Sequence, residues 1–208
     1  MSPRSRNAAF QAPQPPPAAP ISENPAVCLE SMFLHIWTTS MRDLPFVNAA
    51  LSVEAVGFRR WNSSKASVVD PPLLAASTSD VGCALGDWVG AVITPWFINL
   101  FVLPGGGNLW SDRRSGERCQ INFPIGPLEF IADYSPSAVI PSYQYCPLFA
   151  PPSQIASQAA ARAAAMAALD AMFRTLGEAS GPALNSVSTT TVPTDPLRRA
   201  FFRRVVRR

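Results

Sequence analysis

The chain has 208 residues, enough for one domain with tails, and its 48% hydrophobic and 15% charged residues allow a sizeable core. The formal net charge is +3, but six of the 17 basic residues are arginines between positions 198 and 208. The rest of the chain therefore has fewer basic than acidic residues, and a domain-wide nucleic-acid-binding surface is not expected.

The cysteines and the single histidine do not have the spacing of a metal site. Cys28, Cys83, Cys119 and Cys146 are scattered without a C-x-x-C pair, and His35 is the only histidine. We therefore expect no metal ion, and free thiols in a reducing cytosol rather than two disulfides. Because no charged segment followed by an apolar one opens the chain, the sequence predicts a protein that stays in the cytoplasm.

The first predicted elements are a disordered tail and an amphipathic helix. Residues 1–22 are rich in proline and alanine and cannot bury enough apolar surface to fold. Asn24 is the expected N-cap of a helix over residues 25–41, with Pro25 at its first position. The apolar side chains at helical spacing on one face are Leu29, Met32, Phe33, Ile36 and Trp37.

A half-buried strand and a long loop come next. Apolar and polar residues alternate over Leu51–Phe58, which is the pattern of a strand with one buried face. Residues 62–85 are rich in serine, alanine, threonine, aspartate and proline and show little periodicity. This composition predicts a mobile loop.

The stretch 86–105 is the part around which we expect the rest to be organised. It has no charged side chain from Trp88 to Leu103, yet it is shorter than the roughly 20 apolar residues of a membrane span. Pro95 would interrupt a helix in its middle. The stretch is predicted as a strand, a turn and a second strand, at Trp88–Thr94, Pro95–Asn99 and Leu100–Leu103. Two indoles therefore lie beside a proline bend.

The C-terminal half predicts three strands and a long helix. The strands are Cys119–Phe123, Leu128–Ala132 and Tyr143–Phe149, the first two joined by a hairpin turn at 124–127. An alanine-rich helix is expected over 153–176, with Ser153 as its cap and Gly177 after its end. Its predicted packing stripe consists of Ile155, Ala159, Met166, Leu169, Phe173 and Leu176.

These elements predict a single α+β domain over residues 23–178. A mostly antiparallel sheet of about five strands is packed by an N-terminal and a long C-terminal helix. Residues 1–22 and 179–208 are expected to be disordered tails, the second ending in an arginine-rich segment.

No catalytic or cofactor-binding pattern is visible. A serine or cysteine nucleophile needs a base, and no acid or nucleophile can be placed beside the single histidine, His35. The glycines at 105–107 lack the Lys-Ser/Thr pair of a phosphate-binding loop, and no strand–GxGxxG–helix unit occurs. We expect no cofactor.

The sequence leaves two roles open for three tryptophans and one cysteine. Trp88, Trp96 and Trp110 suit a hydrophobic core, but tryptophan is also a frequent anchor at protein interfaces. Cys146 lies in an aromatic strand flanked by proline, where it is either a buried core thiol or a residue that lines a groove for a partner.

Several segments resemble one family. The stretch 86–105 is similar to the GxWxGxxITPWFxNLxLLPG signature of the HybE-type NiFe-hydrogenase assembly chaperones, which include the HupJ and HoxT proteins. Further similar segments are Ser40–Asn48, Val53–Phe58, Trp110, the hairpin Phe123–Ile131, and Tyr143–Phe149. Unlike the family, which runs almost directly from its VGFR strand into GxWxG, this chain has residues 62–84 in between.

The resemblance implies a non-enzymatic, cytoplasmic accessory protein for the maturation of exported NiFe hydrogenases. Its implied partners are the small and large subunit precursors, above all a small subunit with a twin-arginine signal peptide, together with a rubredoxin-like accessory protein. It implies neither nucleic-acid binding nor stable membrane insertion. The residues we expect near a partner-binding surface are Trp88, Thr94, Trp96, Asn99, Trp110 and Cys146.

The arginine-rich tail leaves an alternative function open. It could bind nucleic acid or an anionic membrane, in which case binding would depend strongly on salt. Residues 197–203 also resemble the RRxF core of a twin-arginine signal, with Arg198, Arg199 and Phe201 in the matching positions and Arg203 two residues further on. At this terminus they are not an export signal, and we hypothesise that they occupy the groove for the client's signal until it displaces them.

Overall fold

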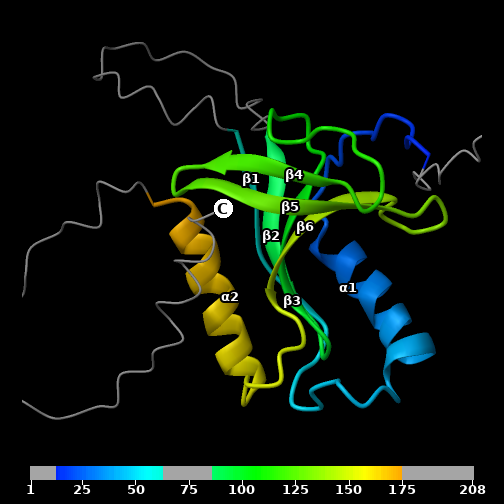
Figure 1. Cartoon of the computed structure of the whole chain (residues 1–208), viewed down its shortest axis with the longest axis vertical. Helices are drawn as coiled ribbons and strands as arrows, with labels where there is room; N and C mark the ends of the chain where they lie inside the picture. The colour runs from blue at the N-terminus through cyan, green and yellow to red at the C-terminus, as the bar shows by residue number, and fades with distance from the viewer. Residues whose placement is uncertain (1–12, 63–85, 175–208) are drawn as a thin grey trace, which may run out of the picture.

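The computed structural model describes residues 13–62 and 86–174. Its centre is one antiparallel sheet of six strands in the order β1-β2-β3-β6-β5-β4 (Figure 1). The strands are β1 (Glu54–Trp61), β2 (Asp87–Ile93), β3 (Ile98–Leu103), β4 (Arg118–Phe123), β5 (Gly126–Tyr134) and β6 (Ser142–Phe149). The predicted α+β class is confirmed, with one strand more than the five expected.

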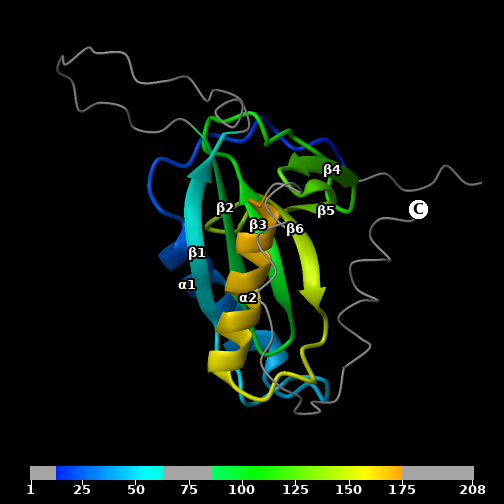
Figure 2. The same cartoon turned by 90° about the vertical axis from the view of Figure 1, so that its left-hand side faces the viewer.

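A helix covers each face of the sheet, α1 (Ala26–Ile36) on one side and α2 (Gln158–Met172) on the other (Figures 1 and 2). The residues of β3 divide between the two faces because side chains of a strand alternate. Phe101 and Leu103 pack in the cluster beneath α1, whereas Leu100 and Val102 pack in the cluster beneath α2. The uncharged stretch is thus buried on both faces, as its composition predicts.

The N-terminal helix has the predicted extent but changes its hydrogen-bond pattern near its end. The side-chain oxygen of Asn24 accepts a hydrogen bond from the amide of Ala26, 3.0 Å away. After Ile36 the chain continues as a π-helical turn, η1 (Trp37–Met41), in which the amide of Arg42 donates to the carbonyl of Trp37. The Thr38 and Thr39 hydroxyls also donate to carbonyls of the preceding turn. Side-chain donors of this kind compete with the regular helical pattern.

The first strand starts later and ends later than predicted, since it pairs with β2 from Glu54 to Trp61. Its register shifts between Val56 and Arg59, around Gly57, which has a φ of +67°. A Cβ atom at Gly57 would lie 2.6 Å from Cδ1 of Leu169 in α2. The glycine therefore permits both the bulge and the close approach of α2.

The C-terminal helix is shorter than predicted. Its cap is Ser157, whose hydroxyl accepts from the amide of Ala160, and not Ser153. The buried stripe is Ala161, Ala165, Leu169 and Met172. The predicted stripe was therefore wrong at Ala159 and Met166, which are exposed. Gly177 and Leu176 lie outside the described residues.

The sequence assigns residues 1–22 to a disordered tail, but the described part of that tail is attached to the domain. Residues 13–22 have no regular secondary structure, and Ile21 donates its amide to the carbonyl of Pro104 at 2.9 Å. The predicted loop at 62–85, except Asn62, and the arginine-rich tail lie outside the described residues. Of the helices in the described ranges, none combines the length and apolar character that a membrane crossing requires.

Candidate functional site

The turn between β2 and β3 is an elbow fixed by one threonine. The Thr94 amide and hydroxyl both donate to the carbonyl of Phe97, at 2.8 and 3.0 Å. The same hydroxyl oxygen accepts from the amides of Phe97 and Trp96, at 2.9 and 3.3 Å. Thr94 is fully buried, and Pro95 occupies the second turn position, which its ring favours. Thr94 therefore acts by positioning Trp96.

Two indoles stack at this elbow. The ring of Trp96 lies 6.0 Å from that of Trp37, with an angle of 9° between the planes. Trp37 is the first residue of the π-helical turn η1, so the irregular end of the helix sets its direction. Both indoles are half-buried, and Phe33 packs edge-on against Trp96 from the core side. A rigid aromatic pair thus reaches the surface.

The loop after η1 is tied to the same end of the sheet through Asn48. The backbone N–H of Asn48 donates to the carbonyl of Pro95 in the elbow at 2.7 Å. Its side-chain nitrogen donates to the carbonyls of Pro152 and Ile155, at 3.0 and 2.7 Å. One asparagine therefore joins three segments that lie far apart in the sequence.

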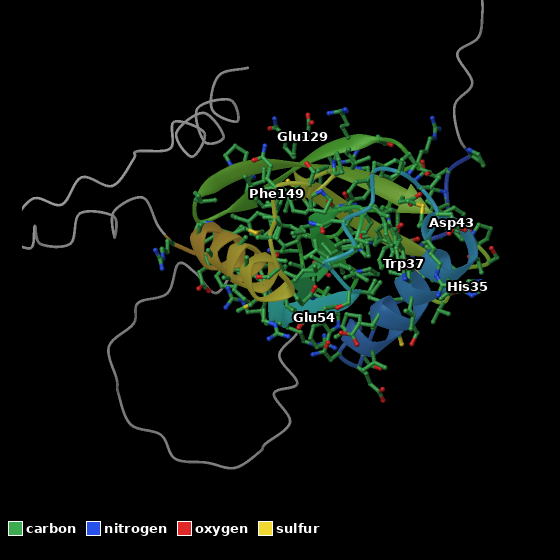
Figure 3. All side chains as sticks on the ribbon, turned by 90° about the horizontal axis from the view of Figure 1, so that it is seen from below. His35, Trp37, Asp43, Glu54, Glu129 and Phe149 are labelled. Atoms are coloured by element: carbon green, nitrogen blue, oxygen red, sulfur yellow. The ribbon has the colours of Figure 1, made fainter. Side chains whose placement is uncertain are left out.

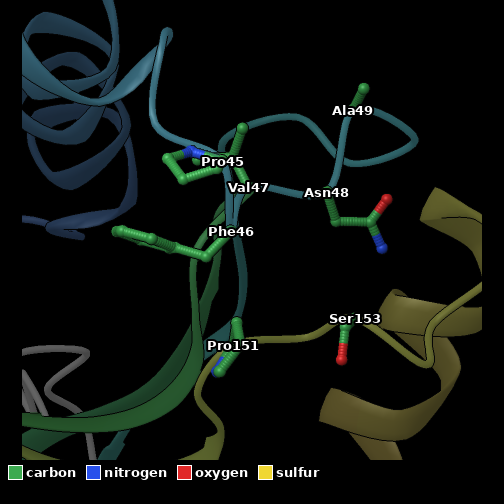
Figure 4. Close-up of a pocket in the computed structure, with 7 residues that line it drawn as sticks. All are labelled: Pro45, Phe46, Val47, Asn48, Ala49, Pro151 and Ser153. Carbon is green, nitrogen blue, oxygen red and sulfur yellow. The ribbon is translucent and has the colours of Figure 1, made fainter.

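These segments enclose an open hollow of about 400 Å³ (Figure 4). Its lining residues are Pro45, Phe46, Val47, Asn48, Ala49, Pro151 and Ser153. Phe46 projects from its loop with 47% of its surface exposed. Phe149, where β6 ends just before the hollow, is 38% exposed. Two large apolar side chains are therefore exposed at this end of the sheet.

We call this region the elbow-end surface. It consists of Trp37, Pro45, Phe46, Val47, Trp96, Phe149 and Pro151. In the view from this end, Trp37 and Asp43 lie beside α1 and Phe149 lies nearer α2 (Figure 3). The segments that resemble the family signature, 40–48, 93–97 and the end of β6, meet here. These segments are far apart in the chain, so only the fold brings them together.

The opposite end of the sheet is held by a buried carboxylate. Oδ1 of Asp87 accepts from the amides of Gly105 and Gly107, at 2.9 and 3.0 Å. Its Oδ2 accepts from the amides of Leu109 and Trp110, at 2.8 and 2.9 Å. Asp87 is fully buried, and its charge is satisfied by these four donors. They fix the path of the loop that follows β3.

The same end contains a cation over an indole. The Arg60 guanidinium lies 4.7 Å from the ring centroid of Trp88 and donates to the carbonyls of Gly105, Ile21 and Ser22. The Trp88 Nε1 also donates to the carbonyl of Ile21, at 2.9 Å. Arg60 and Trp88 thus hold the N-terminal segment against the end of β2 and β3.

The six predicted partner-binding residues do not form one surface. Thr94 and Trp96 lie at the elbow, whereas Trp88 and Trp110 lie at the opposite end of the sheet. Asn99 pairs with Val92 and is buried on the face of the sheet that α1 covers. Its Oδ1 has no hydrogen-bond partner. Cys146 packs with the cluster beneath α2. Only Trp96 contributes a side chain to the elbow-end surface. Arg198, Arg199, Phe201 and Arg203 lie outside the described residues.

The half-buried cysteines are protonated thiols. Burial raises the pKa of Cys146 to about 11, and burial also raises the pKa of Cys119. The thiolate is the form that attacks electrophiles and binds metals, so neither site has an activated nucleophile. Within residues 13–62 and 86–174, no group of three or more histidine, cysteine or acidic residues is placed to hold a metal ion.

Apart from Trp96, sequence reasoning missed the residues of the elbow-end surface, including its other three aromatic residues. Trp37 was assigned to the buried face of its helix, and Phe46 and Phe149 were not singled out as binding residues. For Phe46 a signal was present, since it stands between Pro45 and Val47 in a segment that resembles the family motif. The contact between that segment and the elbow depends on Asn48 and has no local signature.

Comparison with known proteins identifies the family. The family model described as "[NiFe]-hydrogenase assembly, chaperone, HybE" matches residues 24–204. The chain belongs to this HybE family. The resemblance noted in the sequence is thereby confirmed.

Named relatives support this assignment. HoxT of Cupriavidus necator is 38% identical over 134 residues, which cover 62% of this chain and 64% of that protein. The hydrogenase expression/formation protein HupJ of Bradyrhizobium diazoefficiens is 36% identical over 129 residues, covering 62% and 59%. The probable rubredoxin HupJ of Rhodobacter capsulatus is 34% identical over 117 residues, covering 56% and 33%. The match thus spans less than two thirds of these relatives' own lengths.

A solved structure shows the same fold. The solution structure of HybE from Escherichia coli aligns with a TM-score of 0.51 at 19% identity, covering 86% of this chain and 96% of that one. This chain therefore shares its fold with HybE from Escherichia coli.

Proposed function

We propose that this HybE-family protein is a non-enzymatic, cytoplasmic chaperone that binds the precursor subunits of an exported NiFe hydrogenase before export. Its main client would be the small subunit, recognised through the twin-arginine signal peptide. Such peptides combine arginines with an apolar stretch, which needs an apolar surface to shield it from water. The large subunit precursor is the second proposed client.

The observation that carries the proposal is the elbow-end surface. It presents Phe46 at 47% exposure next to a hollow, and a stacked indole pair held by a rigid turn. Aromatic anchors on a rigid support are the usual centres of binding energy at protein interfaces. Membership in a family of hydrogenase assembly chaperones supports the class of client.

A rubredoxin-like accessory protein is also among the proposed partners. The Rhodobacter capsulatus relative is described as a probable rubredoxin, and the match to this chain covers only 33% of its length. We infer that the present protein works beside a separate rubredoxin-like protein, and co-purification of the two from cells that assemble the hydrogenase tests this.

The test measures the affinity of the purified protein for a small subunit precursor by calorimetry. Phe46→Ala removes the most exposed aromatic anchor and is expected to weaken binding by about tenfold, the effect of losing roughly 1.4 kcal/mol. The matched control is Val139→Ala, which removes an apolar side chain that is 69% exposed in the loop before β6, away from the elbow. Equal affinities of Phe46→Ala and the unaltered protein would rule out the elbow-end surface as the client site.

A further inference from the structure

The N-terminal segment 13–22 lies along a surface that contacts its backbone. We call it the segment-contact surface, and it consists of Arg60, Trp88, Pro104 and Asp112. Trp88 Nε1 and the Arg60 guanidinium both donate to the carbonyl of Ile21, at 2.9 and 3.0 Å. Arg60 also donates to the carbonyl of Ser22 at 2.6 Å, and the amide of Ile21 donates to the carbonyl of Pro104. The segment-contact surface therefore offers donors and an acceptor to the backbone carbonyls and amides of the segment.

A second contact lies further along the segment. The Ala18 amide donates to Oδ1 of Asp112 at 3.0 Å, and the same oxygen accepts from Trp110 Nε1 at 3.0 Å. The indole thus fixes the carboxylate in the position that receives the segment. Gln14 adds a longer side-chain contact, donating to the carbonyl of Asp112 at 3.4 Å.

The segment also touches the loop after β3, although most of its residues are exposed. A Cβ atom on Gly106 would lie 4.0 Å from Cβ of Pro20, which is ordinary van der Waals contact. Pro15 is buried, and the sequence from 13 to 20 contains no charged residue. Proline-rich segments are already extended before they bind, and tryptophan and carboxylate side chains are suitable partners for their few free amides and carbonyls.

We propose that the segment-contact surface is a peptide-binding site for an extended, uncharged, proline-containing segment of a partner polypeptide, and that residues 13–22 are its intramolecular occupant. The segment excludes the partner until it leaves this surface. Its attachment to α1 through residues 23–25 keeps it at a high effective concentration, about millimolar for short linkers, so it competes strongly with a free peptide. This site is distinct from the elbow-end surface and does not depend on hydrogenase subunits as clients.

The test uses the full chain and a fluorescent peptide with the sequence of residues 13–24. In the variant Ala18→Pro/Ile21→Pro, two amide donors that hold the segment are lost, while the backbone remains suited to an extended conformation. We expect the peptide to bind this variant about tenfold or more tightly than the unaltered chain, because the competing segment is loosened. Ala19→Pro is the matched control, since the Ala19 amide makes no hydrogen bond, and its peptide affinity should equal that of the unaltered chain.

A further variant tests whether the peptide binds at the segment-contact surface. Adding Trp88→Phe to the double variant removes the Nε1 donor and should weaken peptide binding by about fivefold. The proposal is overturned if the loosened chain does not bind the peptide, if all chains bind it equally, or if Trp88→Phe has no effect. If the double variant does not fold by circular dichroism, Ala18→Pro alone decides, because its change lies outside the two hydrophobic clusters.

Discussion

Asp87→Asn is the substitution whose cost can be worked out most directly from the structure. The carboxylate is fully buried and accepts four backbone amides at 2.8–3.0 Å. An asparagine has the same shape, but its amide group places two hydrogens where two donors now point. Two backbone amides then lose their acceptor, and each buried, unsatisfied amide costs about 1–3 kcal/mol. We therefore expect a loss of about 2–6 kcal/mol in the free energy of unfolding.

Urea denaturation followed by circular dichroism measures this loss. The expected value is a large fraction of the roughly 5–15 kcal/mol that stabilises a typical domain, so the midpoint should move far to lower urea concentration. Asp43→Asn is the control, because Asp43 is exposed and makes no hydrogen bond through its side chain, and it should change stability by less than about 0.5 kcal/mol. If Asp87→Asn were as stable as the control, the assignment of Asp87 as the anchor of the loop after β3 would be refuted.

Two further predictions test the packing and the thiols. Leu169→Ala should lower the free energy of unfolding by about 2–5 kcal/mol, because Leu169 is buried against the sheet. Met166→Ala should lower it by less than about 1 kcal/mol, because Met166 is 38% exposed. Thermal unfolding distinguishes the two variants. At pH 8 the exposed Cys28 should react readily with iodoacetamide. Cys146, with a pKa of about 11, has about 0.1% thiolate at this pH and should react far more slowly, at a rate that rises as the pH approaches 11. Mass spectrometry of the labelled peptides measures both rates, and equal rates would contradict the burial of Cys146.

The elbow could be predicted because its signals are local. An uncharged stretch with β-branched residues predicts buried strands, and Pro95 predicts the turn between them. The start of α2 could not be predicted as well. Ser153 and Ser157 are both acceptable caps, and the chain passes from Pro152 to Ser157 along a path that Asn48 holds in place through its side chain.

The prediction of which α2 residues pack against the sheet was wrong in part for a related reason. An alanine-rich helix has little apolar periodicity, so its sequence does not fix which side faces the sheet. At Gly57 both Leu169 and Met166 contact β1, but Leu169 is buried whereas Met166 remains 38% exposed. Gly57 and Leu169 are more than one hundred residues apart in the chain, so their contact can be recognised only in the folded structure.

The candidate site was predictable in part. The family-like stretch identified Trp96, but the stacking partner Trp37 depends on a π-helical turn that threonine side chains create. The order of residues 13–22 was missed because composition alone predicts disorder, whereas the acceptors and donors that hold the segment come from Trp88 and Asp112.

Hydrogen exchange of the protein with and without a bound small subunit precursor tests the central claim most directly. If the elbow-end surface holds the client, the amides of residues 42–49, 94–97 and 149–153 should exchange more slowly in the complex, while the outer face of α1 should not change. Protection confined to α1, or to residues 13–22 and the segment-contact surface, with no change at the elbow would contradict the account.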